Sequence, residues 1–334
     1  MSAPHDRGFV RRTFLAGAGA LATAGLGTKT WLDRNERGYR SSVFVGKATS
    51  YQASLESLIR DGLTAVGYGP GQTAGRSVLL KPNLVEPSRE APHINTHPAM
   101  VEAAAEVFRR WDAREVIVAE GQGHCRDTEY VLEQSGLGTM LREARLNFVD
   151  LNHDDVVTVT NSLRFTRLPR LTLPRTLRQA DLIVSMPKMK THHWAGITCA
   201  MKNLFGVMPG IVYGWPKNVL HHAGIDQSIL DINAAVRPHL AIVDGIVAME
   251  GDGPIMGTPR HAGVVVVGTN PTAVDATVAR LMTINPAKVA YLAAASGCLG
   301  PIREDHIAQR GESLTALAQP FRLLDHPAFR ALRA

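Results

Sequence analysis

The chain has 334 residues and a formal net charge of +6, with 45% hydrophobic and 20% charged residues. This length leaves room for one large or two modest domains, each with its own hydrophobic core, and the composition is that of a globular protein. The modest positive charge fits a small anionic ligand. The absence of a basic stripe interleaved with aromatic residues argues against a nucleic-acid partner.

Three cysteines, Cys125, Cys199 and Cys298, lie far apart in the sequence. No C-x-x-C motif occurs, so an iron–sulfur cluster or a zinc site built from cysteines alone is not expected. The odd number also argues against a disulfide framework. We therefore expect the three cysteines to be small buried hydrophobic residues.

The chain opens with the pattern of a twin-arginine signal peptide. Arg11-Arg12 precede Phe14-Leu15, an apolar Gly/Ala-rich run extends to Gly27, and small residues at Ala22 and Ala24 suit cleavage after Ala24. Residues 1–24 are therefore predicted to direct export through the twin-arginine translocase to the periplasm or another extracytoplasmic space. The run is too short and too rich in glycine for a convincing membrane span, although an uncleaved signal would act as a membrane tether.

After the signal, residues 25–40 are polar and predict a linker. Residues 41–310 alternate apolar, strand-like runs with helical patterns, and residues 311–334 form a C-terminal extension. The predicted strands are Ser42–Val45, Ser77–Lys81, Glu115–Ala119, Leu146–Asp150, Asp181–Met186, Leu240–Asp244 and Gly263–Val267. The predicted helices are Gln52–Val66, Pro98–Trp111, Thr128–Gln134, Gly138–Ala144, Asp226–Ala235, Pro271–Met282 and Pro286–Ser296.

This alternation predicts an α/β fold in which a mostly parallel sheet carries helices on both faces. Residues 187–224 interrupt the pattern, because they are rich in Lys, His and Gly and lack a clear period. We expect a long irregular insertion there, with a functional role or partial disorder.

Charged residues follow most of the predicted strands, at the sheet edge where open α/β sheets bind ligands. A basic set suits a phosphate or carboxylate, and solvated surface lysines are the alternative. It comprises Lys81, Lys188, Lys190 and Lys202. An acidic set suits a divalent metal, and helix caps and tight turns are the alternative. It comprises Glu120, Asp244, Glu250 and Asp252.

Histidines occur in two adjacent pairs, His192-His193 and His221-His222. His192 and one member of the second pair are candidates for metal ligands or proton shuttles, or for hydrogen-bonded loop histidines. Asp275 is expected in the first turn of a helix, where it would complement the helix dipole. The sequence contains no G-x-S-x-G, H-E-x-x-H, Walker A or G-x-G-x-x-G motif.

Six blocks of sequence, in the same order, resemble the domain-of-unknown-function family numbered 362. They are Val78–Val85, Val116–Gly121, Met186–His192, Met201–Gly206, Ile242–Pro254 and Asn270–Ala276. Asn83, which follows the strand at Val78–Leu80, and Asn203 are among the matching positions, most of which are the strand-end residues named above. Many members of that family carry a ferredoxin-like iron–sulfur segment, but this chain lacks the cysteine run for one.

The sequence leaves two functions open. We favour an exported enzyme that acts on a small anionic substrate, with or without a divalent metal. The alternative is a non-catalytic binding or cofactor-maturation protein for an exported partner. The candidate catalytic residues are His192, Glu120 and Lys188, the anion-binding residues are Lys81, Asn83, Lys190, Lys202 and Asn203, and the metal ligands are Asp244, Glu250 and Asp252.

Overall fold

The computed structural model describes Glu36 and residues 38–333. The predicted signal peptide and most of the predicted linker therefore lie outside the described residues. Within the described part of the chain, no helix is both long enough and apolar enough to cross a membrane.

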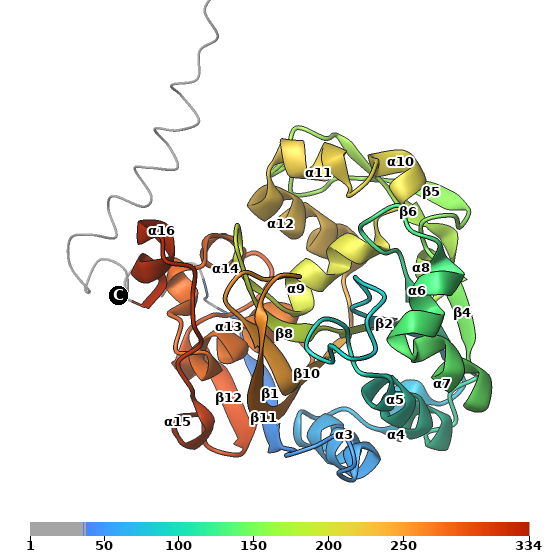
Figure 1. The fold of residues 1–334 in the computed structure, drawn as a ribbon, viewed down its shortest axis with the longest axis horizontal. Coiled ribbons are helices and arrows are strands. Elements are labelled where there is room, and N and C mark those ends of the chain that lie inside the picture. Colours follow the sequence, from blue (N-terminus) through green and yellow to red (C-terminus); the bar gives the residue numbers. More distant parts are fainter. Residues whose placement is uncertain (1–35, 37, 334) are drawn as a thin grey trace, which may run out of the picture.

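A ten-stranded sheet forms the centre of the molecule (Figure 1). The strands along its main path follow the order β12-β1-β11-β10-β7-β2-β3-β4, and β8 and β9 join through β10. Their bounds are β1 Ser41–Lys47, β2 Ser77–Pro82, β3 Glu115–Glu120, β4 Asn147–Asp150, β7 Leu182–Met186, β8 Lys188–His192, β9 Gly196–Thr198, β10 Leu240–Glu250, β11 Thr258–Gly268 and β12 Ile307–Gly311. Among the described strands of this sheet, only the pairs of β11 with β1 and β10, and of β9 with β8, are antiparallel.

Helices cover both faces of this sheet, and the alternation of side chains along each strand explains why. On β2, Val78 and Leu80 enter the core beneath one set of helices, whereas Leu79 enters the core on the opposite face. The first set is α3 Leu55–Ala65, α5 Pro98–Arg110, α6 Thr128–Ser135 and α7 Leu137–Glu143. The second set is α9 Ala200–Asn203, α12 Ile225–Val236, α13 Pro271–Leu281 and α14 Ala290–Ala295. The predicted fold class is confirmed.

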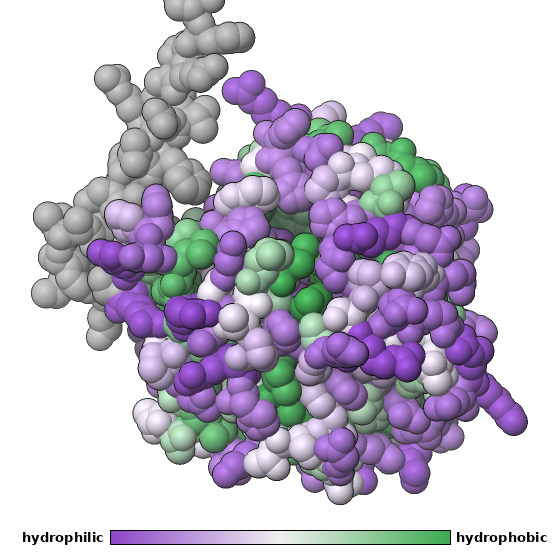
Figure 2. Space-filling model, viewed as in Figure 1, coloured by the Kyte–Doolittle hydropathy of each residue, from purple (hydrophilic) through white to green (hydrophobic). Residues whose placement is uncertain are grey.

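The predicted irregular insertion at residues 187–224 is instead an ordered part of the fold. Besides β8, β9 and α9 it contains the short helices η2 Leu204–Val207, α10 Gly210–Tyr213 and α11 Asn218–Ala223. Strand β8 is buried along its whole length, since it pairs with the part of β10 that runs beyond the parallel sheet edge. Figure 2 shows a largely hydrophilic outer face on which hydrophobic side chains gather over α10, where Ile211 and Val212 are exposed.

Both ends of the described chain pack against the α/β domain. Glu36, from the predicted linker, is fully buried and accepts hydrogen bonds from the Ser296 hydroxyl and the Ile302 backbone N–H, each at 2.7 Å. In the predicted C-terminal extension, Phe321 and Leu332 are buried in the core. The packed domain therefore extends beyond residues 41–310 at both ends.

The cysteines differ from one another in burial. Cys199 is buried as expected and Cys298 is partly exposed. Cys125 is exposed, contrary to expectation, because it lies in the loop that leads from β3 to α6.

Candidate functional site

Five lysine side chains, four of them from the segment 187–224, lie near the carboxyl edge of the sheet and close enough for their charges to act on one another. We call Lys81, Lys188, Lys190, Lys202 and Lys217 the lysine cluster. Lys202 is partly exposed, and the other four expose no more than 2% of their surface. Lysine is rarely buried without a partner, so the partners of each ammonium group decide what the cluster can do.

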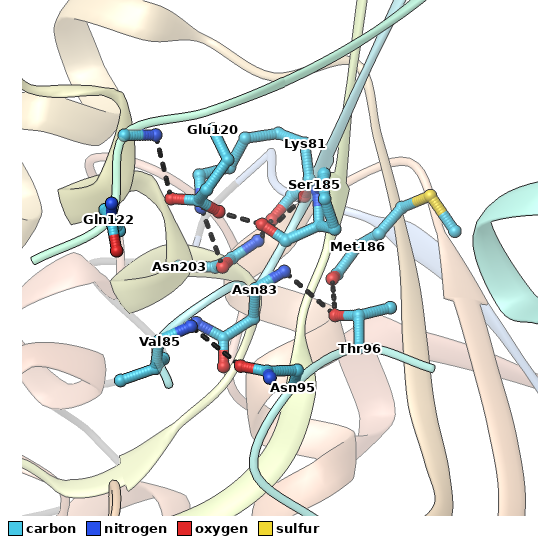
Figure 3. A network of polar contacts seen from close by, with 12 residues as sticks. Lys81, Asn83, Val85, Asn95, Thr96, Glu120, Gln122, Ser185, Met186 and Asn203 are labelled. Atoms are coloured by element: carbon cyan, nitrogen blue, oxygen red, sulfur yellow. Dashed lines mark hydrogen bonds and ion pairs between the residues drawn. The ribbon is translucent and has the colours of Figure 1, made fainter. Parts of the chain in front are cut away.

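Lys81, near the end of β2, uses all three of its donors within the protein. Its Nζ donates to the Pro82 carbonyl at 2.8 Å, to Asn203 Oδ1 at 3.1 Å and to Glu120 Oε2 (Figure 3). An ammonium group has no further donor, so Lys81 has none left for a ligand. Burial lowers the pKa of Lys81 and raises the pKa of Glu120, and their ion pair opposes both shifts.

Glu120 and Asn203 are likewise occupied by internal contacts. Glu120 Oε1 accepts from the Gly121 N–H at 3.1 Å, and the backbone of Gly206 approaches the Lys81–Glu120 pair so closely that a Cβ there would collide with both side chains. Asn203 donates to the Lys81 carbonyl and to the Ser185 hydroxyl, each at 3.1 Å, and so ties α9 to β2 and β7. The predicted roles of Lys81 and Asn203 in direct anion contact, and of Glu120 in catalysis, do not fit these contacts.

Lys188 belongs to a second internal network on β8. Its Nζ donates to Asp244 Oδ2 at 2.5 Å and to the Tyr51 hydroxyl at 3.0 Å. Asp244 also accepts from the Tyr51 hydroxyl and from the His97 backbone N–H, each at 3.0 Å. Burial lowers the pKa of Lys188, and the Asp244 carboxylate opposes that shift. Lys188 has one donor left, whereas Asp244 is enclosed by donors.

The predicted metal ligands do not meet. Asp244 and Glu250 are separated along β10 by six residues at about 3.3 Å each. Glu250 accepts from the Arg322 N–H at 3.0 Å, and Asp252 is half exposed beside His193. Among the described residues, no group of three or more His, Cys, Asp or Glu side chains could hold a metal ion. The predicted grouping of Asp244, Glu250 and Asp252 as one metal site is therefore wrong.

The other three lysines have donors without acceptors. Lys190 Nζ donates to the Pro254 carbonyl at 3.2 Å, and Lys217 Nζ donates to Asn152 Oδ1. Lys202 Nζ makes no hydrogen bond within the described residues and lies 5.3 Å from the centre of the Phe205 ring. None of the three forms an ion pair with a described acidic group, although the charges of Glu120 and Asp150 act on Lys217 and the charge of Asp226 acts on Lys202.

Burial dominates the electrostatics of these three lysines. It lowers the pKa of Lys217 to about 7 and that of Lys202 to about 8. It lowers the pKa of Lys190 well below the ordinary value, and the charges of Lys188 and Lys202 lower it further. Burial also raises the pKa of Asp226 to about 6, which limits its value as a counter-ion. A bound anion would reverse the three lysine shifts, because it favours the charged ammonium.

His192, at the end of β8, lies beside Lys190 and Lys202. Its Nδ1 accepts from the backbone N–H groups of Trp194 at 3.0 Å and Ala195 at 3.2 Å. Burial lowers its pKa well below the usual range, and the charge of Lys202 adds to this. The ring is therefore neutral with its proton on Nε2, so it is a hydrogen-bond donor rather than the predicted acid/base group.

Of the second histidine pair, His221 faces the site and His222 is exposed. His221 Nδ1 lies 3.0 Å from the Lys217 carbonyl oxygen, which can only accept, so His221 donates from Nδ1. The predicted dipole role of Asp275 is also wrong. It lies beyond the first turn of α13 and accepts from the Ala200 and Met201 N–H groups at the start of α9, at 2.7 and 3.2 Å.

Sequence reasoning missed Lys217 and His93. Lys217 lies in the Lys/His/Gly-rich segment, and that composition could have indicated it as a site residue. Its left-handed backbone (φ 68°) is not expected for lysine. His93 lies close enough to Lys188 and Lys190 for their charges to lower its pKa, after the larger effect of burial, and its Nδ1 is buried with no described partner. The predicted residue Asn83 also keeps a buried, unpartnered Oδ1.

The chain is similar to several known proteins, in sequence or in structure. A thylakoid-associated protein of Synechocystis sp. is 29% identical over 261 residues, which cover 76% of this chain and 78% of that protein. The lactate racemase apoprotein of Thermoanaerobacterium thermosaccharolyticum aligns with 12% identity and a TM-score of 0.42, over 65% of this chain and 52% of that chain. A Thermotoga maritima protein aligns with 10% identity and a TM-score of 0.35, over 64% and 54%.

Both structural alignments thus span about half the length of the solved chains. The family model described as a domain of unknown function, DUF362, matches residues 78–280, which is more than half of this chain. The chain belongs to the DUF362 family.

Proposed function

We propose that this protein binds a small anion, a phosphate or a carboxylate, in the lysine cluster. The observation that carries the proposal is that Lys190, Lys202 and Lys217 keep hydrogen-bond donors without acceptors. The nearby carboxylates Glu120 and Asp244 are already paired with the other two lysines. Burying an unpaired ammonium costs several kcal/mol. An anion that accepts from these donors would offset that cost.

The contacts divide the site into a framework and a binding surface. The framework holds the strands and α9 in place, and it consists of Lys81 with Glu120 and Asn203 and of Lys188 with Asp244. Lys190, Lys202 and the Nε2–H of His192 would contact the anion, and Lys217 would add charge from the segment before α11. Charge-assisted hydrogen bonds of this kind are the strong ones in anion recognition.

An enzymatic role is a second candidate, and one observation favours it. The pKa of Lys217 is lowered to about 7, so its amine can accept a proton near neutral pH, while neutral His192 can donate a hydrogen bond to developing negative charge. A binding or cofactor-maturation protein needs the lysine charges but not a neutral amine. If Lys217→Arg restores the phenotype of a deletion strain, the enzymatic candidate is contradicted.

Export is part of the same proposal and rests on the sequence pattern around Arg11-Arg12. A protein that leaves by the twin-arginine route crosses the membrane folded, so the buried lysine framework would form before export. The anion would then meet the site in an extracytoplasmic space, with an uncleaved signal acting as a membrane tether.

Calorimetric titration of sulfate into the protein at pH 6.5, in chloride buffer of constant ionic strength, tests the binding. We expect one sulfate per chain, with no measurable binding to the Lys190→Met/Lys202→Met double variant. The exposed Lys47 on β1 supplies the matched control, because Lys47→Met removes one charge without touching the cluster. Binding by the double variant at wild-type affinity, or no binding by the wild-type protein, would contradict the proposal.

A further inference from the structure

A continuous row of rings leads from the buried lysines to the surface. Lys202 Nζ lies 5.3 Å from the centre of the Phe205 ring, and that ring lies 5.5 Å from the ring of His221. The His221 ring in turn lies 5.9 Å from the indole of Trp194. The row therefore joins a cation with unfilled donors to an aromatic side chain that is 65% exposed.

The turn between β8 and β9 carries Trp194, the surface end of this row, and ties it to one of the anion donors. The Trp194 N–H donates to His192 Nδ1, so the same turn holds the indole and sets the Nε2–H donor of His192. The ring of Trp194 meets His193 edge-on at 89° and His221 at 70°. In a T-shaped contact the edge of one ring meets the face of the other, and the large exposed part of the indole, 65% of the side chain, can receive a stacking partner.

An exposed tryptophan beside a polar site needs an explanation, because the indole is a large apolar group that proteins usually bury in good part. Its backbone is held by His192 and its ring contacts His193 and His221, but most of its surface stays in solvent. Ordering an apolar ring at this position stabilises the fold little. It does place an exposed ring in the same turn as His192, one of the proposed anion donors.

We propose that the ligand is an aromatic anion, whose charged group contacts Lys190 and Lys202 and whose planar ring stacks on Trp194. This inference rests on the proposed anion-binding function and names the chemical class of the ligand. An aliphatic anion of equal size would gain the charge contacts but not the stacking. Stacking of this kind corresponds to roughly a threefold to tenfold gain in affinity.

The test compares phenyl phosphate with cyclohexyl phosphate, which closely match in size, and uses inorganic phosphate as the reference. Each affinity is expressed per dianion, because phenyl phosphate loses its second proton at a lower pH than the other two compounds. Calorimetric dissociation constants are measured at pH 6.5 for the wild-type protein, for Trp194→Leu and for Phe165→Leu. Phe165 is the matched control, because it is an exposed aromatic residue between β5 Val156–Thr160 and β6 Arg170–Pro174. We expect the wild-type protein and Phe165→Leu to prefer phenyl phosphate roughly threefold to tenfold.

In Trp194→Leu the preference should vanish while the affinity for inorganic phosphate stays unchanged. If inorganic phosphate binds but the wild-type protein shows no aromatic preference, or Trp194→Leu keeps it, the aromatic ligand is refuted and the anion site stands. If the wild-type protein binds none of the three compounds, the anion site and the aromatic ligand both fail.

Discussion

At the scale of single residues, the lysine cluster contains two physically different kinds of lysine. Lys81 and Lys188 are matched by carboxylates in short ion pairs, so removing either lysine would leave a buried charge without a partner. Lys190, Lys202 and Lys217 have no such match. Removing one of these relieves a desolvation cost that the protein bears without obvious structural benefit.

This difference predicts opposite effects on stability. Lys190→Met should raise the free energy of unfolding by about 1 kcal/mol or more and weaken sulfate binding at least about tenfold. Lys81→Met should lower the free energy of unfolding by about 3–5 kcal/mol, because Glu120 loses its counter-ion. Urea unfolding at pH 7 without sulfate measures both. A Lys190→Met variant destabilised as much as Lys81→Met would show that Lys190 is structural.

The lowered pKa values predict how binding depends on pH. Sulfate stays dianionic above pH 5, whereas Lys217 and Lys202 lose their protons as the pH rises through about 7 and about 8. Sulfate affinity should therefore fall between pH 6 and pH 9, and binding should take up protons above pH 7. Calorimetry in buffers of different ionisation enthalpy measures that uptake. An affinity that is constant over this range would contradict the prediction.

The same pKa shifts determine whether the free energy of unfolding of the anion-free protein rises or falls with pH. The folded pKa of each lysine lies below its unfolded value of about 10.4, so the unfolded chain binds more protons between pH 7 and 10. The contribution of Lys202 and Lys217 to the free energy of unfolding therefore rises with pH across that window.

At the scale of elements, the sequence predicted the strands that are made of apolar residues. It missed strands of polar residues, which are buried only through tertiary contacts. The Val-, Ile- and Leu-rich cores of β2, β7 and β11 are all present. Strand β8 reads Lys-Met-Lys-Thr-His, and these polar residues are buried because the strand pairs with both β10 and β9. Strands β5 and β6 form a separate two-stranded sheet in which β5 remains half exposed, so no continuous apolar run marks it.

The start of α9 shows how one buried carboxylate can position a binding residue. Asp275 accepts from Ala200, Met201 and the Tyr291 hydroxyl, and α9 carries Lys202. Asp275→Ala should lower the free energy of unfolding by about 1–3 kcal/mol and weaken sulfate binding, since two backbone donors lose their acceptor. Tyr291→Phe, which removes one of the donors to Asp275, should have a smaller effect on both. Wild-type sulfate affinity in Asp275→Ala would show that α9 holds Lys202 without this contact.

At the scale of the whole molecule, the position of the site at the sheet edge was predictable from the sequence. The role of each charged side chain at that edge was not. Strand order brings the ends of β2 and β3 together, so Lys81 and Glu120 were expected to meet. Which lysine keeps free donors depends on contacts such as those of Asn203 and Tyr51, which come from distant parts of the chain. The metal prediction failed for the same reason, because Asp244 is enclosed by donors and Glu250 binds the C-terminal segment.

Export also concerns the whole molecule. Replacing the paired arginines, Arg11→Lys/Arg12→Lys, should retain the protein inside the cell, because the twin-arginine route depends on that pair. Cell fractionation with an antibody against the folded domain measures this, with Arg7→Lys as the matched control. Export that is unaffected by the double change would refute the twin-arginine assignment.

The central claim is that Lys190 and Lys202 hold an anion, and anomalous diffraction tests it most directly. Crystals grown with selenate, a heavier analogue of sulfate, would reveal each bound ion by the anomalous signal of selenium. The account predicts a strong peak from a selenate whose oxygens lie within hydrogen-bond distance of Lys190 Nζ and Lys202 Nζ, absent from crystals of the Lys190→Met/Lys202→Met variant. Selenate bound elsewhere on the molecule, with none at these two lysines, would contradict it.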